Sequence, residues 1–311
     1  MGPIRPKKEK KMKKRKTYDM VITAIFSAII LLMSLIPQLG YITLMPGVSV
    51  TLVHIPVLIG VMLLGFKGSI ILGFFFGLGS LFAALMYART PFDMAFIYPW
   101  ISVLPRMLFA LAAHYIAVSF VKITKLKYGK IALMITVSLV TSVALYFGTN
   151  AIVKNATLND YNKTLSEISV LKKEDEAGNQ TLIIELEEKL PGLLEKANND
   201  YQKITTITTP IIIVITILII VIYVIYIKKQ KEEGVAIPSI LILSTLIHTA
   251  LVIGAVALFN PDAFLQTFGG DQSVASILYA IAMANGLIES LVAVFIGTPI
   301  FLALKEVKES M

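Results

Sequence analysis

The chain has 311 residues, of which 56% are apolar and 15% charged, and its mean hydropathy is +0.79. A soluble domain carries roughly 25% charged residues, so this composition excludes a soluble globular fold and indicates a polytopic membrane protein. No cysteine is present, which excludes disulfides, thiolate metal sites and cysteine nucleophiles.

A basic tail, residues 1–17, opens the chain and supplies much of the net charge of +8. Beside a first apolar stretch, such a tail is above all a topology signal, and it can also hold anionic lipid head groups. Because no aromatic residue interleaves with the basic ones before Tyr18, we expect no nucleic-acid partner. No small-residue cleavage site follows Leu35, so we interpret the first stretch as a retained helix and not a signal peptide.

Apolar stretches of near spanning length then follow one another along the chain. Each is close to the ~20 residues that a bilayer core requires. They predict an all-α protein with about eight transmembrane helices, at 18–36, 50–66, 69–86, 97–121, 131–153, 207–227, 237–259 and 274–304. Lys67-Gly68 is expected to form the turn between the second and third helices. The last stretch is long enough to tilt or to contain a break.

Lysines between the stretches predict the orientation, because cytoplasmic loops are enriched in Lys and Arg. With the amino terminus inside, the inside loops hold Lys67, four lysines within 122–130, and three within 228–231. We therefore expect a multi-pass protein of the cell membrane, with its amino terminus and the tail 306–311 in the cytoplasm.

The polar segment 154–206 lies outside in this topology. Leu182, Leu186, Leu190 and Leu194 recur every four residues, and Glu185 and Lys189 form a favourable i,i+4 pair. With a turn at residues 177–179, the segment predicts a helical hairpin standing on the membrane. It either binds a partner or packs on itself and its neighbours.

Motifs for catalysis are missing. There is no H-E-x-x-H pair and no G-x-S-x-G elbow. Gly60 and Gly65 have the spacing of phosphate-loop glycines, but Phe66 stands where the lysine is required. We expect no enzyme activity, no metal site and no cofactor.

Arg106 is the most informative polar residue, because it lies inside an apolar stretch. An arginine at the bilayer centre costs about 2.5–3.5 kcal/mol on insertion scales, so an intramembrane arginine predicts an anion site. The alternative is snorkelling to lipid phosphate. The other candidate binding residues within the stretches are Asn285, His248, His54, Ser80 and Glu289.

Each of these candidates has an alternative role. His54 and His248 could each be hydrogen-bonded core histidines, and Glu289 could pair with Arg106 and leave no free charge. Trp100 could cover a pocket or belong to an interfacial aromatic belt. If the residues converge, they form a pocket for a small polar anion with hydroxyl or amide groups.

Ala24 and Ala28 place small residues four apart on the first helix, which allows close helix approach in lipid.

Several runs resemble the substrate-binding S components of energy-coupling factor (ECF) vitamin transporters, most of all the pantothenate-type members. These runs are SVTLVHIPVLIGVMLLGFKGSIILGFFFGLGSLFAA, TPFDMAFIYPWISVLPRMLFAL, TLIHTALVIGAVALF and ANGLIESLVAVFIGTPI. The family's usual Asn-Thr pair is His248-Thr249 here. The resemblance covers residues 18–121 and 235–305. Residues 131–228, which contain hairpin 154–206, depart from the family pattern, and we interpret them as an inserted helical pair.

The resemblance implies the membrane-embedded substrate-binding subunit of an ECF-type importer. Such a subunit captures a vitamin outside and delivers it through a transmembrane coupling subunit and two ATPase subunits. Arg106 would hold a carboxylate, Asn285 and His248 would bond hydroxyl and amide groups, and His54 and Ser80 would shape the pocket. Loop 38–49 would cover the ligand, and Ala24 and Ala28 would dock onto the partner.

Two other classes of function stay open. One is a stand-alone secondary transporter in which Glu289 carries protons. The other is a membrane interaction protein that acts through the outside hairpin.

Overall fold

Long apolar helices make up most of the chain. The computed structural model describes residues 6–45, 48–174, 179–229, 232–263, 285–286 and 288–310. Its elements are α1 (Pro6–Leu35), α2 (Pro37–Gly40), β1 (Tyr41–Met45), β2 (Val48–Thr51), α3 (His54–Tyr87), α4 (Pro91–Ala95), α5 (Pro99–Thr124), α6 (Gly129–Thr157), α7 (Asn159–Glu174), α8 (Gln180–Lys229), α9 (Glu232–Phe259), η1 (Ala293–Gly297) and α12 (Thr298–Ser310).

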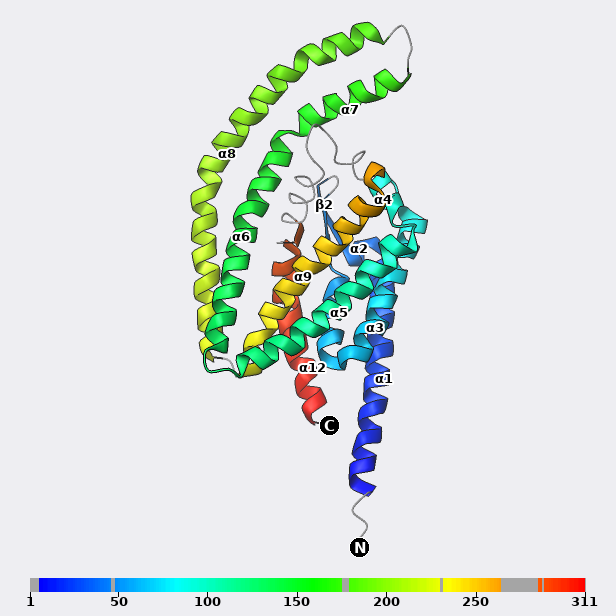
Figure 1. Ribbon diagram of the computed structural model, residues 1–311, viewed down its shortest axis with the longest axis vertical. Helices are drawn as coiled ribbons and strands as arrows, with labels where there is room; N and C mark the ends of the chain where they lie inside the picture. Colours follow the sequence, from blue (N-terminus) through cyan, green and yellow to red (C-terminus); the bar gives the residue numbers. More distant parts are fainter. Residues whose placement is uncertain are drawn as a thin grey trace.

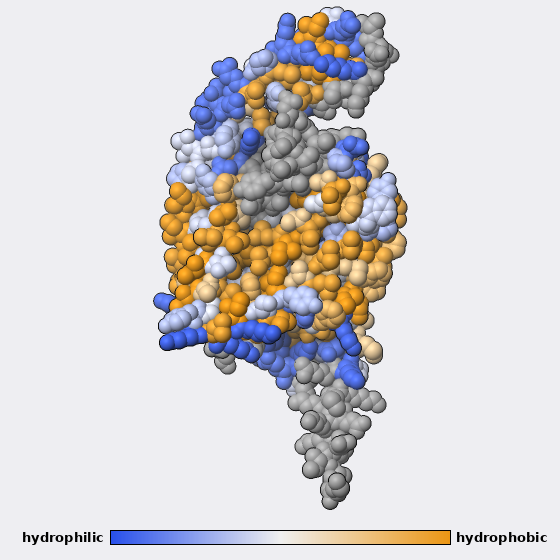
Figure 2. Space-filling view, in the orientation of Figure 1, coloured by the Kyte–Doolittle hydropathy of each residue, from blue (hydrophilic) through white to orange (hydrophobic). Residues whose placement is uncertain are grey.

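Seven helices in this described part are long and apolar enough to cross a membrane. Figure 2 shows the corresponding band of apolar surface, with hydrophilic surface above and below it. The predicted class, an all-α polytopic membrane protein, is confirmed. The count of seven differs from the predicted eight because α3 holds both the second and the third predicted helices.

A break at Gly65 divides α3 into two arms. Gly65 has φ 70° and ψ −156°, a conformation that is essentially restricted to glycine. A Cβ built on Gly60 would lie 2.3 Å from Leu72 Cδ1, so the arm before the break contacts the arm after it. The predicted turn at Lys67-Gly68 is therefore placed slightly too late.

A small β-hairpin precedes α3 and corrects two expectations. β1 and β2 pair antiparallel, with Tyr41 opposite Thr51 and Ile42 opposite Val50. Residues 50–51, predicted to begin a helix, belong to β2, and the helix begins at His54. The predicted cover, loop 38–49, thus includes an ordered strand pair, which lies in the half of the bundle away from both termini (Figure 1).

Glycines bring α3 close to its neighbours. A Cβ on Gly77 would lie 2.5 Å from Val103 Cα of α5, and one on Gly79 would lie 2.4 Å from Ser34 Oγ of α1. Helix backbones can approach this closely only where no side chain intervenes. The buried core, which includes Phe76 and Phe109, lies around α3 and α5.

Segment 154–206 forms a helical hairpin, as predicted, but its second arm is part of a longer helix. α7 packs along the start of α8, and α8 continues without interruption into the apolar stretch 207–227. Figure 1 shows this arm projecting at the top of the molecule. Lys172 pairs with Glu187 at 2.7 Å across the hairpin.

The predicted leucine face of the hairpin's second arm is only partly confirmed. Glu185 and Lys189 form the expected pair at 2.6 Å, which lowers the pKa of the Glu185 carboxyl. Leu182 and Leu194, however, are 42% and 38% exposed. Between residues 181 and 197, the less exposed positions of this arm are 183, 186, 190, 193 and 197, whose spacing of three and four residues matches the helical repeat.

Both described ends of the chain lie at the same end of the bundle, together with the α5–α6 connection, the end of α8 and the start of α9 (Figure 1). Lys125 in the α5–α6 connection and Lys228 in the last turn of α8 are both exposed at this end. Lys308 connects α12 to α3 and α1 at this end of the bundle. Its Nζ donates a hydrogen bond to the Leu63 carbonyl of α3 and forms an ion pair with Asp19 of α1.

The predicted last helix, 274–304, lies partly outside the described residues. From 288 the chain is helical to Ser310, six residues further than predicted, with a π-helical turn, η1, inside it. Such turns are frequent at functional sites.

Candidate functional site

Three polar side chains from distant parts of the chain meet in the protein interior. His54 begins the first arm of α3, His248 lies in the middle of α9, and Glu289 precedes η1. Their side chains are 0%, 4% and 3% exposed. One ligand atom of each lies within 4.8 Å of the others. Three of the residues predicted from sequence are thus brought together.

Glu289 connects the segments that carry the two histidines. Its Oε1 accepts a 2.7 Å hydrogen bond from the Thr51 backbone N–H, and its Oε2 accepts one of 2.9 Å from Thr249 Oγ1. Thr51 ends β2, three residues before His54, and Thr249 follows His248 in α9. The carboxylate therefore fixes the β-hairpin and α9 against the last helix.

Aromatic rings enclose His248. Its ring centroid lies 5.5 Å from that of His54, 5.3 Å from that of Phe76 and 4.7 Å from that of Phe109. The polar group is therefore set in an apolar wall, an environment in which hydrogen bonds and charges interact strongly.

Arg106 lies in the same region and is 6% exposed. Its guanidinium carbon is 5.2 Å from the Phe76 ring centroid and 5.1 Å from that of Phe96, within cation–π range. Nη1 donates to the Ser102 carbonyl at 2.9 Å, while Nε has no hydrogen-bond partner within the described protein.

Arg106 and Glu289 interact electrostatically, but no ion pair joins them in the described structure. The acid instead accepts its two hydrogen bonds from the threonines. The alternative in which Glu289 neutralises Arg106 by direct pairing is therefore not the arrangement found. The guanidinium keeps hydrogen-bonding capacity for another acceptor.

Several buried polar atoms at this site lack hydrogen-bond partners within the described protein. They are both ring nitrogens of His54 and His248, and Arg106 Nε. Asn285 Oδ1, four residues before Glu289 in the chain, is also buried without a partner in the described protein. The Thr51 carbonyl lies near the His54 ring, but outside hydrogen-bond geometry. An unsatisfied buried polar group costs about 1–3 kcal/mol. A polar ligand that reached several of these atoms would recover much of that cost.

The remaining predicted binding residues are placed differently. Ser80 is buried, one helical turn beyond Phe76 on α3. Trp100 is 49% exposed and stacks on Tyr98, with ring centroids 5.0 Å apart, so it is not among the buried groups.

Sequence reasoning missed several residues of the site. Thr51 acts through its backbone N–H, which carries no sequence signal. Phe76 and Phe109 resemble any other apolar residue of a membrane helix, and Phe96 follows the short helix α4. Tyr41, which interacts electrostatically with Arg106, could have been found only by expecting a strand pair at 41–51.

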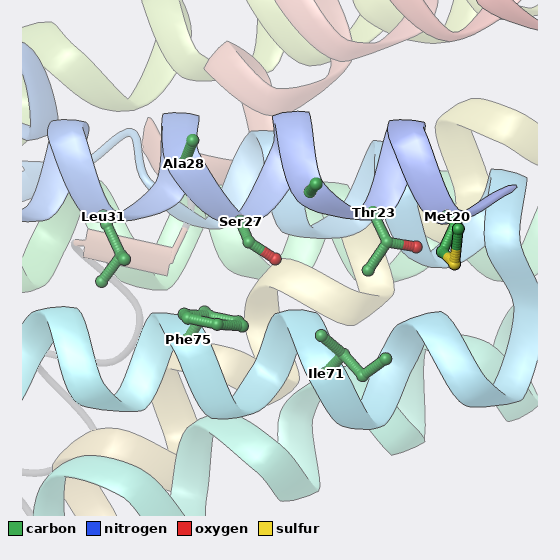
Figure 3. A pocket seen from close by; sticks show the side chains of 8 residues that line it. Met20, Thr23, Ser27, Ala28, Leu31, Ile71 and Phe75 are labelled. Carbon is green, nitrogen blue, oxygen red and sulfur yellow. The ribbon is translucent and has the colours of Figure 1, made fainter. Parts of the chain in front are cut away.

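Ala24 and Ala28 line a shallow surface pocket between α1 and α3. Its α1 side holds Met20, Thr23, Ala24, Ser27, Ala28 and Leu31, and its α3 side holds Ile71 and Phe75 (Figure 3). Both alanines are exposed, so a helix of another subunit could approach α1 closely here.

Comparison with known proteins agrees with this architecture. Residues 18–169 match the family model of the ECF transporter, substrate-specific component. The chain is 38% identical over 103 residues to a protein named pantothenate transporter PanT, from Leuconostoc mesenteroides. That alignment covers 32% of this chain and 50% of the relative, so the chain matches about half of the relative's length. Through residues 18–169, the chain is therefore similar to the ECF transporter substrate-specific components.

Proposed function

We propose that the protein is the substrate-binding subunit of an ECF-type importer and that its ligand is a vitamin carrying a carboxylate, with pantothenate favoured. The observation that carries the proposal is the buried Arg106, which keeps an unpartnered Nε beside further unpartnered polar atoms. The family match and the similarity to a protein named as a pantothenate transporter support the substrate class.

In this proposal Arg106 binds the carboxylate, because a planar guanidinium offers charge-assisted and bidentate hydrogen bonds. Asn285 and His248 bond hydroxyl and amide groups, while His54 and Ser80 shape the pocket. The aromatic residues Phe76 and Phe109 supply apolar contact around the ligand, as in most small-molecule sites. The β-hairpin covers the ligand, since Thr51 is already bonded to Glu289.

The topology proposed with this function has both termini in the cytoplasm of a cell-membrane protein. The site then lies in the outer half of the bundle, on the same side as hairpin 154–206, and the ligand enters from outside. The helical pair 131–228 is an addition to a six-helix core. Its α6 and α8 pack along each other, which supports this division.

Delivery across the membrane requires partners in this proposal: a transmembrane coupling subunit and two ATPase subunits. No motif for ATP hydrolysis is present in the chain itself. The exposed Ala24 and Ala28 on α1 are the proposed contact, because small residues let a partner helix approach closely.

Thermal unfolding of the detergent-solubilised protein against a panel of water-soluble vitamins tests the substrate. A ligand at 100 times its Kd stabilises the native state by about 2.7 kcal/mol. Stabilisation by pantothenate that is lost in Arg106→Ala would support the proposal. Stabilisation by another vitamin alone would exclude pantothenate as the substrate but would still support a vitamin-binding subunit. A folded protein that responds to no vitamin would refute the proposal.

Co-purification with the coupling subunit and ATPases tests the docking role. Ala28→Trp fills the close-approach surface of α1 and is expected to abolish complex formation. Ile25→Trp is the matched control, because Ile25 is 48% exposed on the same helix and does not line the pocket. Equal complex formation by both variants would exclude this docking surface. Uptake by cells without the ATPases would favour the secondary transporter.

A further inference from the structure

We propose that His54, His248 and Glu289 together bind one divalent transition-metal ion of the zinc class. Nothing in the spacing of these residues indicates a metal site, and the sequence predicts none. The fold nevertheless brings one ligand atom from each within 4.8 Å of the other two, with all three side chains buried.

The donor set suits such an ion. Two imidazole nitrogens with one carboxylate oxygen are a recurrent zinc ligand set, which leaves a fourth position for water or a bound ligand. Tetrahedral coordination at about 2.0–2.1 Å places ligand atoms about 3.4 Å apart. The observed spacing of up to 4.8 Å must therefore shorten by up to about 1.4 Å when the ion binds.

The two histidines are free to act as ligands. Neither ring nitrogen of His54 or of His248 is hydrogen-bonded within the described protein, although both rings are at least 96% buried. A core histidine retained for packing alone normally satisfies at least one nitrogen, because a buried polar atom without a partner is costly. A metal ion would satisfy one nitrogen of each ring at the same time.

Glu289 is oriented in the manner of a metal-binding carboxylate. The Thr51 N–H and the Thr249 hydroxyl each donate to one of its oxygens, at 2.7 and 2.9 Å. Outer hydrogen bonds of this kind orient metal ligands. Each donor also belongs to the segment that carries one of the two histidines, so the carboxylate and both rings are positioned together.

The charge balance points the same way. A buried carboxylate is expensive without a cation close to it. In the described structure, Glu289 has hydrogen bonds from neutral groups but no ion pair, and Arg106 donates instead to the Ser102 carbonyl. A divalent ion between Glu289 and the histidines would compensate its charge directly.

Metal binding by the full-length chain tests the inference. The protein is purified in detergent without a polyhistidine tag, stripped with EDTA and titrated with Zn²⁺ and with Co²⁺. Zinc content after desalting and the visible absorption of bound Co²⁺ are the readouts. We expect one equivalent in the wild type and a loss of at least tenfold in affinity in His54→Gln and in His248→Asn.

The third histidine supplies the control. His114 lies on α5 and contacts Phe66 and Tyr115, away from the triad, so His114→Gln should keep full metal binding. His248→Asn introduces the residue usual in the resembling family and should therefore fold even if His54→Gln does not. Failure of the wild type to retain metal, or retention by a folded His248→Asn protein, would overturn the inference.

The vitamin experiment is run on the EDTA-treated protein in parallel, which separates the two proposals. Vitamin stabilisation without metal binding would refute the metal site and leave the proposed function. Metal binding without any vitamin response would refute the proposed function and leave the metal site.

Discussion

At the residue scale, Arg106 shows how a membrane helix holds a buried guanidinium. Phe76 and Phe96 lie near it and the Ser102 carbonyl accepts from Nη1, so its burial is only partly compensated by the protein. Nε remains without a partner. A ligand carboxylate would supply the acceptor that Nε lacks. This is the physical reason for placing the proposed ligand's carboxylate at Arg106.

Arg106→Lys should therefore weaken vitamin binding even though the charge is kept. Lysine lacks the planar fork, and a charge-assisted hydrogen bond contributes about 1.5–3 kcal/mol, or roughly 10- to 100-fold in Kd. Titration calorimetry in detergent measures the change. Arg89→Lys is the matched control, because Arg89 precedes the short helix α4 and is not part of the buried site. Equal Kd values for the two variants would contradict the carboxylate role.

Glu289→Ala should destabilise the protein by about 2–5 kcal/mol, because it removes the acceptor of two buried donors and opens a cavity. Glu289→Gln should cost less, since its amide oxygen can still accept one of those hydrogen bonds. Thermal unfolding of the ligand-free protein compares the two variants. Exposed Glu185→Ala should change stability by no more than about 0.5 kcal/mol. If Gln and Ala destabilised equally, the two hydrogen bonds would not be the cause.

At the element scale, the break in α3 is what places His54 in the site. Gly65 lets the chain fold back, so that the short first arm ends among the other helices and its amino end reaches the β-hairpin. Gly65→Ala should destabilise the fold by about 1–3 kcal/mol, because a side chain strains this backbone conformation.

Gly192→Ala is the matched control for Gly65→Ala. Gly192 lies in helix α8, and a Cβ there would meet nothing within 4 Å, so alanine should stabilise the helix by about 0.5–1 kcal/mol. Thermal unfolding of the two variants should therefore move in opposite directions. A Gly65→Ala protein as stable as the wild type would show that the break tolerates a side chain.

At the scale of the whole molecule, the hairpin formed by α7 and the start of α8 projects away from the buried site (Figure 1). Replacing residues 156–203 by a short Gly/Ser linker should therefore leave vitamin stabilisation unchanged within error. Loss of activity in cells with vitamin binding intact would assign the hairpin to a partner. Loss of vitamin binding in a folded deletion variant would instead make the hairpin part of the site.

Orientation is also a property of the whole molecule, and the absence of cysteine makes it simple to test. Asn198→Cys on the hairpin should react with a membrane-impermeant maleimide in intact cells. Lys125→Cys, in the α5–α6 connection beside the termini, should react only after the cells are opened. The reverse pattern would place the vitamin site on the cytoplasmic side.

The sequence alone determined the class and the approximate positions of most of the long apolar helices, and it supplied the candidate residues, because apolar length and intramembrane charge are local signals that hydropathy reveals directly. It also indicated the helical hairpin. Tertiary structure decided what local pattern cannot: that the chain reverses at Gly65, that residues 41–51 pair as strands, and that Glu289 bonds Thr51 and Thr249. The meeting of His54, His248 and Glu289 depends on contacts across up to 238 positions, as from Thr51 to Glu289, and no spacing along the chain encodes such a contact.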